Sequence, residues 1–168
     1  HAADTAPWVI ISSFAEDEPV QDLWQALLAL DAHTFVFTSS LPAEWQHLPR
    51  EAPPHIRFSG YLELTDYHQL LATATGCICL TTRDRIQPNG ALEALAWAKP
   101  LITSDTPTLR NLLGEGARYI AHPDELGPAL NAWLDMDPET RRARQSAVRQ
   151  RLLDLWSEHL RQLRQLLT

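Results

Sequence analysis

Apolar and polar positions alternate along the chain in a way that predicts strands and helices in turn. Short apolar runs such as "WVII" and "GCICL" predict buried strands. Between these runs, apolar residues recur at helical spacing, as Val20, Leu23, Trp24 and Leu27 do. The predicted strands are residues 7–14, 34–40, 55–62, 76–82, 100–105 and 117–122, and the predicted helices are residues 18–32, 64–75, 89–99, 106–116, 123–135 and 138–168.

This alternation defines the fold class. Continuous apolar strands are typical of a sheet that is covered on both faces. We therefore predict an α/β fold: an open, parallel, six-stranded, doubly wound (Rossmann-like) sheet with helices on both faces and a long C-terminal helix. Residues 1–7 are interpreted as a trimmed or linker remnant, 8–137 as one domain, and 138–168 as the C-terminal helix.

Several residues are predicted to begin or end these helices. Gly114 or Gly116 is expected to end the helix 106–116, because glycine readily adopts the left-handed conformation of a helix end. The final helix has an apolar stripe of Leu152, Trp156, Leu160 (or His159), Leu163 and Leu167. The predicted N-caps are Asp17 or Glu18, Thr65 or Asp66, and Asn89.

Charge narrows the function classes. The net charge is −7, and residues 138–168 carry a local +4, which leaves −11 for the rest. Such an acidic body argues against nucleic-acid binding. The arginines of the tail could face an anionic membrane surface or a partner domain, or could form a solvated helix face. No apolar run reaches the length of a membrane span.

No metal or cofactor motif stands out. The seven histidines are scattered, and Cys77 and Cys79 lack the spacing of a zinc site. These two cysteines are predicted to share one face of a strand as buried, reduced thiols, which suits a cytoplasmic protein. G-x-G-x-x-G, Walker-type and G-x-S-x-G motifs are absent. We predict no bound metal and no cofactor.

The strongest candidate site lies where doubly wound sheets bind ligands, at the switch point in strand order. With the order 3-2-1-4-5-6, the walls of that crevice are the polar loops 12–19 and 81–90. The acids Glu16, Asp17 and Glu18 of the first loop also have a plain interpretation as helix-start charges.

The second loop and the helix after it carry the candidate chemistry. Asn89 and Gly90 begin the predicted helix, whose free N–H groups form an anion site. Gly90 would let a ligand approach the backbone closely, and Arg83 and Arg85 could add charged contacts. Glu93 is predicted to share the face of Asn89 and Gly90, where it could accept ribose hydroxyls; a solvated surface acid is the alternative.

Three segments resemble a known family in the right order: "VIISSFAEDEPVQDLWQAL", "HIRFSGYLELTDYHQLLATATGCICLTT" and "GALEALAWAKPLITSDTPTLRNLLGEGARYI". They are similar to the C-terminal, nucleotide-sugar-binding half of GT-B glycosyltransferases of the family 4 or group 1 type, over residues 8 to 135. The resemblance implies that Glu93 is the second Glu of the E-x7-E motif and contacts the ribose. It also implies that the amides of Gly90, Ala91 and Leu92 hold the diphosphate, that Gly60 and Tyr61 lie near the base, and that Phe14 and its loop lie near the donor phosphates.

The sequence departs from the family pattern at several positions. The first Glu of E-x7-E falls on Arg85, with Asp84 one place away, so the catalytic residues are unassigned and these two are the candidates. No Lys or Arg lies in loop 12–19, and Lys99 is interpreted as replacing the usual Gly before the strand 100–105.

We expect the donor-binding domain of a bacterial, cytoplasmic glycosyltransferase, located at the inner face of the membrane if the tail contacts lipid. Its donor substrate would be a nucleotide-diphospho-sugar, and transfer would retain the anomeric configuration. The acceptor would be held by an N-terminal domain of the same parent chain, so the isolated domain would be inactive. The alternatives are a non-catalytic interaction module with a degenerate GT-B fold, and a GT-B-fold sugar-nucleotide epimerase.

Overall fold

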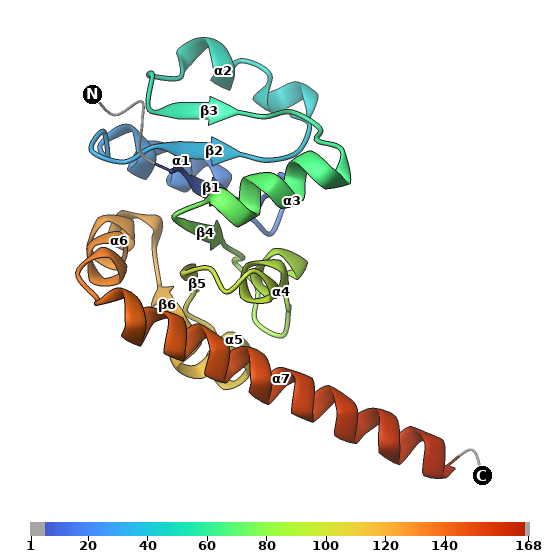
Figure 1. Cartoon of the computed structure of the whole chain (residues 1–168). Helices are drawn as coiled ribbons and strands as arrows, with labels where there is room; N and C mark the ends of the chain where they lie inside the picture. Colours follow the sequence, from blue (N-terminus) through green and yellow to red (C-terminus); the bar gives the residue numbers. More distant parts are fainter. Residues whose placement is uncertain (1–5, 167–168) are drawn as a thin grey trace.

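The computed structural model describes residues 6–166, which contain a six-stranded parallel sheet with the order β3-β2-β1-β4-β5-β6 (Figure 1). This order confirms the predicted doubly wound sheet. Each strand is shorter than predicted, because the residues that follow it leave the ladder to form loops at the carboxyl edge. The strands are β1 (Trp8–Ile10), β2 (Phe35–Phe37), β3 (Ile56–Phe58), β4 (Gly76–Cys79), β5 (Leu101–Ser104) and β6 (Ala117–Ile120).

All helices except α2, which lies in a stretch between two predicted strands, occupy predicted helical segments of the chain. They are α1 (Val20–Leu28), α2 (Leu48–Glu51), α3 (Leu64–Thr73), α4 (Asn89–Ala96), α5 (Pro107–Leu113), α6 (Leu126–Leu134) and α7 (Pro138–Leu166). Short 3-10 turns lie at Ala43–Trp45, Gly114–Gly116 and Pro123–Glu125. Gly114 ends α5 with φ 51°, as predicted. Among residues 6–166, no helix is long and apolar enough to cross a membrane.

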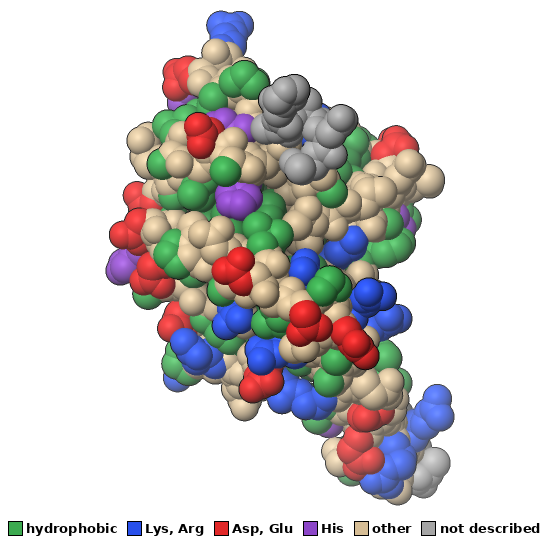
Figure 2. Space-filling view, turned by 60° about the vertical axis from the view of Figure 1, so that its left-hand side comes forward, with side chains coloured by type: hydrophobic (Ala, Val, Ile, Leu, Met, Phe, Trp, Pro, Cys, Tyr) green, Lys and Arg blue, Asp and Glu red, His purple; other side chains and the backbone are tan. Residues whose placement is uncertain are grey.

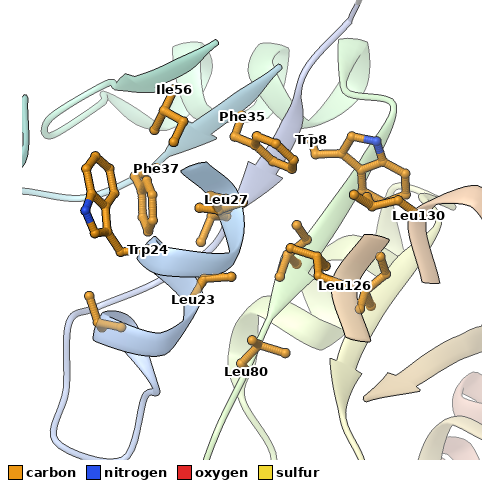
Figure 3. Close-up of a cluster of buried hydrophobic side chains, with 14 of the residues drawn as sticks. Trp8, Leu23, Trp24, Leu27, Phe35, Phe37, Ile56, Leu80, Leu126 and Leu130 are labelled. Carbon is orange, nitrogen blue, oxygen red and sulfur yellow. The ribbon is translucent and has the colours of Figure 1, made fainter. Parts of the chain in front are cut away.

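Helices cover both faces of the sheet, because successive strand residues point to opposite sides. On one face, Trp8 and Ile10 of β1 lie in a core with residues of α1 and α6. Figure 3 shows Leu23, Trp24 and Leu27 of α1 against the aromatic rings of β2. On the other face, Val9, Cys77 and Cys79 pack against α3, α4, α5 and α7. Cys77 and Cys79 are thus free, buried thiols on one face, as predicted.

The predicted N-caps are wrong. The residues before α1, α3 and α4 are Pro19, Glu63 and Pro88, and none of them makes a side-chain cap hydrogen bond. Asn89 is the first residue of α4 and does not cap it. The acids of loop 12–19 are not simple helix-start charges either, because Asp17 and Glu18 hydrogen-bond within the loops of the crevice, as described below.

The end of α4 explains a departure from the family pattern. Ala98 has φ 51°, in the left-handed region, and its N–H donates to the carbonyl of Leu95, while the N–H of Lys99 donates to the carbonyl of Ala94. This is a Schellman motif, in which the left-handed position favours glycine. The residue that stands where glycine is usual is therefore Ala98 and not Lys99. The Lys99 ammonium instead donates to the carbonyls of Ala72 and Ala74 at the end of α3.

The buried residues of helix α7 lie in its first half. Gln145 and Val148 are buried there, and Nε2 of Gln145 donates to the carbonyl of Gly116 at 2.8 Å. The predicted apolar stripe continues along the second half but is largely exposed, with Trp156 64% exposed. That half projects beyond the sheet in Figure 1. Figure 2 shows basic and acidic side chains intermixed over the same end of the molecule. Leu167 lies outside the described residues.

Candidate functional site

A cleft of about 470 Å³ opens at the carboxyl ends of β1 and β4, where the strand order reverses. We call it the crevice. Its volume is in the range of small-molecule sites. It lies where the sequence predicted it, between loops 12–19 and 81–90. The lining residues are Ile11, Ser12, Ser13, Ala15, Asp17, Glu18, Thr38, Ser39, Tyr61, Leu62, Tyr67, Cys79, Leu80, Thr81, Ile86, Pro88, Asn89, Gly90 and Glu93.

Glu93 lines the crevice together with Asn89 and Gly90, so the face of α4 predicted from helical spacing is confirmed. Its side chain is half-buried, and its carboxylate accepts a hydrogen bond from the hydroxyl of Tyr67 on α3. Burial and this hydrogen bond raise the pKa of the Tyr67 hydroxyl above its usual value. Tyr67 was missed by sequence analysis, because its partner lies 26 residues away in the chain.

Gly90 is required by packing. A Cβ at this position would lie 2.6 Å from Cγ2 of Ile11 and 2.9 Å from Sγ of Cys79. The first turn of α4 thus packs directly on β4 and on the residue after β1, which brings its N–H groups to the crevice. Ala91 is fully buried and its N–H donates to the carbonyl of Pro88 at 3.1 Å. Leu92 turns to the other side of α4, toward α7.

Loop 12–19 is held by Glu18. The carboxylate of Glu18 accepts hydrogen bonds from the N–H of Ser13 at 3.0 Å, the N–H of Phe14 at 3.1 Å and the hydroxyl of Ser13 at 2.7 Å. It also accepts one from the hydroxyl of Ser12. Phe14 adopts φ 59°, in the left-handed region, next to these two N–H groups. The sequence gives no signal for this arrangement, since no glycine marks the left-handed residue.

Asp17 joins the two walls of the crevice. Its carboxylate accepts from the hydroxyl of Thr81 at 3.0 Å, and its carbonyl accepts from the N–H of Thr82 at 2.6 Å. The N–H of Thr81 in turn donates to the hydroxyl of Ser104 at 2.9 Å. The loops after β1 and β4 and the end of β5 are therefore connected by hydrogen bonds at the crevice.

The structure does not bring the candidate residues Arg83, Asp84 and Arg85 into the crevice lining. All three are exposed. The carboxylate of Asp84 accepts from the N–H of Thr108 at 3.2 Å, and the N–H of Arg85 donates to the hydroxyl of Thr108 at 3.2 Å. Hydrogen bonds with Thr108 lower the pKa of Asp84. This part of loop 81–90 is thus attached to the start of α5.

The remaining predicted residues are divided between the crevice and the core. Tyr61 lines the crevice and is 74% exposed, whereas Gly60, with φ 67°, does not line it. The side chain of Phe14 is buried in the core, stacked on Phe37 with ring centroids 5.8 Å apart. Only the backbone of Phe14 can therefore contribute to ligand contacts.

The crevice is acidic. Asp17, Glu18 and Glu93 line it, and within residues 6–166 no Lys or Arg is among the lining residues. In the same part of the chain, no group of three or more His, Cys, Asp or Glu side chains could hold a metal ion. The polar groups available to a ligand are carboxylates, hydroxyls and the N–H groups at the start of α4.

The chain belongs to the glycosyl transferases group 1 family, whose pattern matches residues 8–135. This confirms the family predicted from the sequence. No curated protein is significantly similar to the chain in sequence.

Several solved structures share this fold. HepE of Anabaena, in complex with UDP-glucose, has a TM-score of 0.65 at 14% identity, over 94% of this chain and 50% of HepE. Sucrose-phosphate synthase of Thermosynechococcus elongatus has a TM-score of 0.73 at 21% identity, over 96% of this chain and 44% of that protein. A protein from Listeria monocytogenes, described as a UDP-N-acetylglucosamine 2-epimerase, has a TM-score of 0.61 at 15% identity, over 95% and 46%. The chain thus spans half or less of the length of each, and at these identities the likeness shows a shared fold.

Proposed function

We propose that this chain is the donor-binding domain of a glycosyltransferase, which binds a nucleotide-diphospho-sugar in the crevice. The observation that carries the proposal is the position of Glu93, half-buried in the crevice one turn inside α4. A carboxylate accepts hydrogen bonds from a pair of neighbouring hydroxyls, as a ribose presents them. The N–H groups at the start of α4 lie on the same side and favour a negatively charged phosphate.

Glycosyl transfer would use these groups to stabilise the leaving diphosphate, in the manner of preorganised hydrogen-bond donors. We propose that transfer retains the anomeric configuration and that the isolated chain is inactive, because the acceptor is held by an N-terminal domain of the same parent protein. We also propose a cytoplasmic location. The catalytic residues remain unassigned, with Asp84 and Arg85 as candidates by their place in the motif.

Calorimetry tests the role of Glu93. HepE is described in complex with UDP and UDP-glucose, so UDP is the first probe, with ADP and GDP beside it. We expect Glu93→Ala to weaken UDP binding by about 10- to 100-fold, since charge-assisted hydrogen bonds are lost. The variant should leave the affinity for 2′,3′-dideoxyuridine diphosphate unchanged.

The matched control is Glu115→Ala, which removes an exposed acid from the 3-10 turn before β6. It should bind UDP as the wild type does. Equal UDP affinities for Glu93→Ala and the wild type would remove Glu93 from the site. No binding of any nucleotide by the folded wild type would favour the alternative, a non-catalytic interaction module. The crevice lining, which contains no Lys or Arg from residues 6–166, is consistent with that alternative.

The second half of α7 supports the proposal of a partner domain. Leu153, Trp156, Leu160, Leu163 and Leu166 are all exposed there, although the same helix is docked through Gln145 and Val148 further back. A groove beside them, lined by Leu92, Leu112, Leu152 and Trp156 among others, is also apolar. Uncovered apolar surface of this extent marks an interaction site.

Sedimentation velocity and vesicle pelleting distinguish the possible occupants of this surface. If the protein is monomeric and does not pellet with vesicles, the result supports the acceptor domain as the partner that covers this surface. Self-association would point to a second copy, and it should disappear in Trp156→Ser. Pelleting with anionic but not neutral vesicles would point to a membrane surface, through Arg161 and Arg164 beside the stripe.

A further inference from the structure

The contacts of Glu18 indicate that loop 12–19 has an anion-binding site, and that the Glu18 carboxylate of the same loop occupies it. Two successive N–H groups, from Ser13 and Phe14, converge on the Glu18 carboxylate at 3.0 and 3.1 Å. Successive N–H groups around a left-handed residue form a concavity that binds anions. In this chain the left-handed residue is Phe14, and the anion bound is a side chain of the same loop.

This carboxylate lies in the crevice. Glu18 lines it together with Asn89 and Gly90 at the start of α4, and with Glu93. A ligand that places phosphate on the α4 N–H groups and its ribose at Glu93 would therefore bring negative charge close to Glu18. Like charges at short distance disfavour each other, and no Lys or Arg among residues 6–166 lines the crevice to offset the repulsion.

The Glu18 side chain borders a second hollow besides the crevice. This hollow of about 360 Å³ lies beside Val20 and Trp45, and its lining includes the acids Glu16, Asp22 and Glu44. Glu18 itself precedes α1 and is half-buried. A rotation of its side chain would therefore move the carboxylate out of the crevice without disturbing the helix.

We propose that the Glu18 carboxylate is a built-in competitor for the phosphate groups of the ligand, and that a diphosphate binds by displacing it from the N–H groups of Ser13 and Phe14. Glu18 is then a specificity-determining residue: it lowers affinity for diphosphates and leaves affinity for an uncharged nucleoside unaffected. The inference rests on the proposed nucleotide site. Glu18 and Glu93 lie on different walls of the crevice, Glu18 in loop 12–19 and Glu93 in α4.

Calorimetry with UDP and with uridine tests the proposal. Glu18→Gln keeps the size of the side chain and removes its charge, so UDP affinity should rise by about tenfold or more while uridine affinity stays the same. Glu51→Gln is the matched control, because Glu51 is an exposed acid that lines neither the crevice nor the hollow. It makes the same change in net charge and should alter UDP affinity less than twofold.

The outcomes separate the two proposals. If the wild type binds UDP and Glu18→Gln binds it equally or more weakly, the competitor role is overturned and the nucleotide site stands. If neither protein binds UDP or uridine, the nucleotide site fails and the competitor role fails with it. Should Glu18→Gln prove unstable in thermal unfolding, amide NMR of the wild type decides: UDP, and not uridine, should shift the N–H signals of Ser13 and Phe14, and unchanged signals at bound UDP would overturn the proposal.

Discussion

The hydroxyl of Tyr67 donates a hydrogen bond to the carboxylate of Glu93, and this contact joins the first turn of α3 to α4 inside the crevice. Burial and the neighbouring carboxylate raise the pKa of Tyr67, so the hydroxyl stays protonated and remains a donor. Among residues 6–166, no hydrogen bond from another side chain reaches the second oxygen of Glu93. Tyr67 thus orients Glu93 and leaves it capacity to accept from a ligand.

Replacing Tyr67 by phenylalanine should therefore weaken nucleotide binding without removing the acid. A hydrogen bond to a charged group contributes about 1.5–3 kcal/mol, but Tyr67 acts on the ligand only through Glu93, so we expect Tyr67→Phe to lower UDP affinity by about two- to tenfold in calorimetry. Tyr119→Phe is the matched control. The Tyr119 hydroxyl is also partly buried, but it donates to the carbonyl of Gly114 at 2.7 Å, far along the sheet. That variant should lose stability and keep UDP affinity; the reverse pattern would contradict the role given to Tyr67.

The close approach of α4 to the sheet makes a second prediction, at Gly90. An added methyl would lie 2.6 Å from Cγ2 of Ile11 and 2.9 Å from Sγ of Cys79, so α4 would have to move. Overpacking of this kind costs about 1–3 kcal/mol. We expect Gly90→Ala to lower the free energy of unfolding by that amount in urea, and to lower UDP affinity as the start of α4 shifts.

Gly127→Ala provides the control for Gly90. Gly127 lies in α6, and a methyl there would meet only Cδ2 of Leu30, at 3.2 Å. The end of a flexible leucine can move, and alanine is favoured over glycine in a helix by about 1 kcal/mol. This variant should be as stable as the wild type or more so. Equal losses at both glycines would show that the close packing of α4 is not the cause.

The sequence predicted the large-scale arrangement well, for physical reasons that can be named. Alternating apolar runs and amphipathic stretches determine which elements form, and a doubly wound sheet has few topologies, so the crevice between β1 and β4 followed. The helical spacing of Asn89, Gly90 and Glu93 placed Glu93 in that crevice. These predictions depend on local pattern and on general rules of topology.

The parts that sequence analysis missed depend on contacts between distant residues or on unusual backbone. Tyr67 meets Glu93 across 26 residues, and no local pattern marks the pair. The turn at Phe14 has a left-handed φ without a glycine, so the role of Glu18 was hidden. Arg83 and Arg85 were chosen for their charge, yet Thr108 of α5 holds this part of the loop away from the crevice lining.

The left-handed residue at the end of α4 makes a third prediction. Ala98 adopts φ 51° without the freedom of a glycine. We expect Ala98→Gly to raise the free energy of unfolding by about 1 kcal/mol, because the left-handed conformation costs a Cβ-bearing residue about that much. Ala96→Gly, at an exposed helical position two residues earlier, should lower stability by about the same amount. Urea denaturation of both variants measures the contrast, and a loss at Ala98 would contradict the assignment of the Schellman motif.

Stability at alkaline pH follows from the two buried thiols. Burial is the main cause that raises the pKa of Cys77 and of Cys79 from 9.0 to about 12 in the folded protein. A thiol of this kind binds its proton more tightly when folded, so its contribution to stability is full below pH 9 and is lost as pH rises from 9 toward 12. Each thiol should lower the free energy of unfolding by at most about 1.4 kcal/mol per pH unit in that window.

The double variant Cys77→Ala, Cys79→Ala isolates this contribution. It should be less stable than the wild type at neutral pH, because two buried side chains are shortened. Its free energy of unfolding should nevertheless fall less steeply above pH 9, since the two thiols no longer ionise on unfolding.

Tyr67 and Tyr119, whose pKa values are also raised by burial, are present in both proteins and cancel in the difference. Urea titrations between about pH 7.5 and pH 10.5, a range that crosses the ordinary thiol pKa of 9.0, measure the two slopes. Identical slopes would mean that Cys77 and Cys79 reach solvent in the folded protein, against their position beneath α3 and α4.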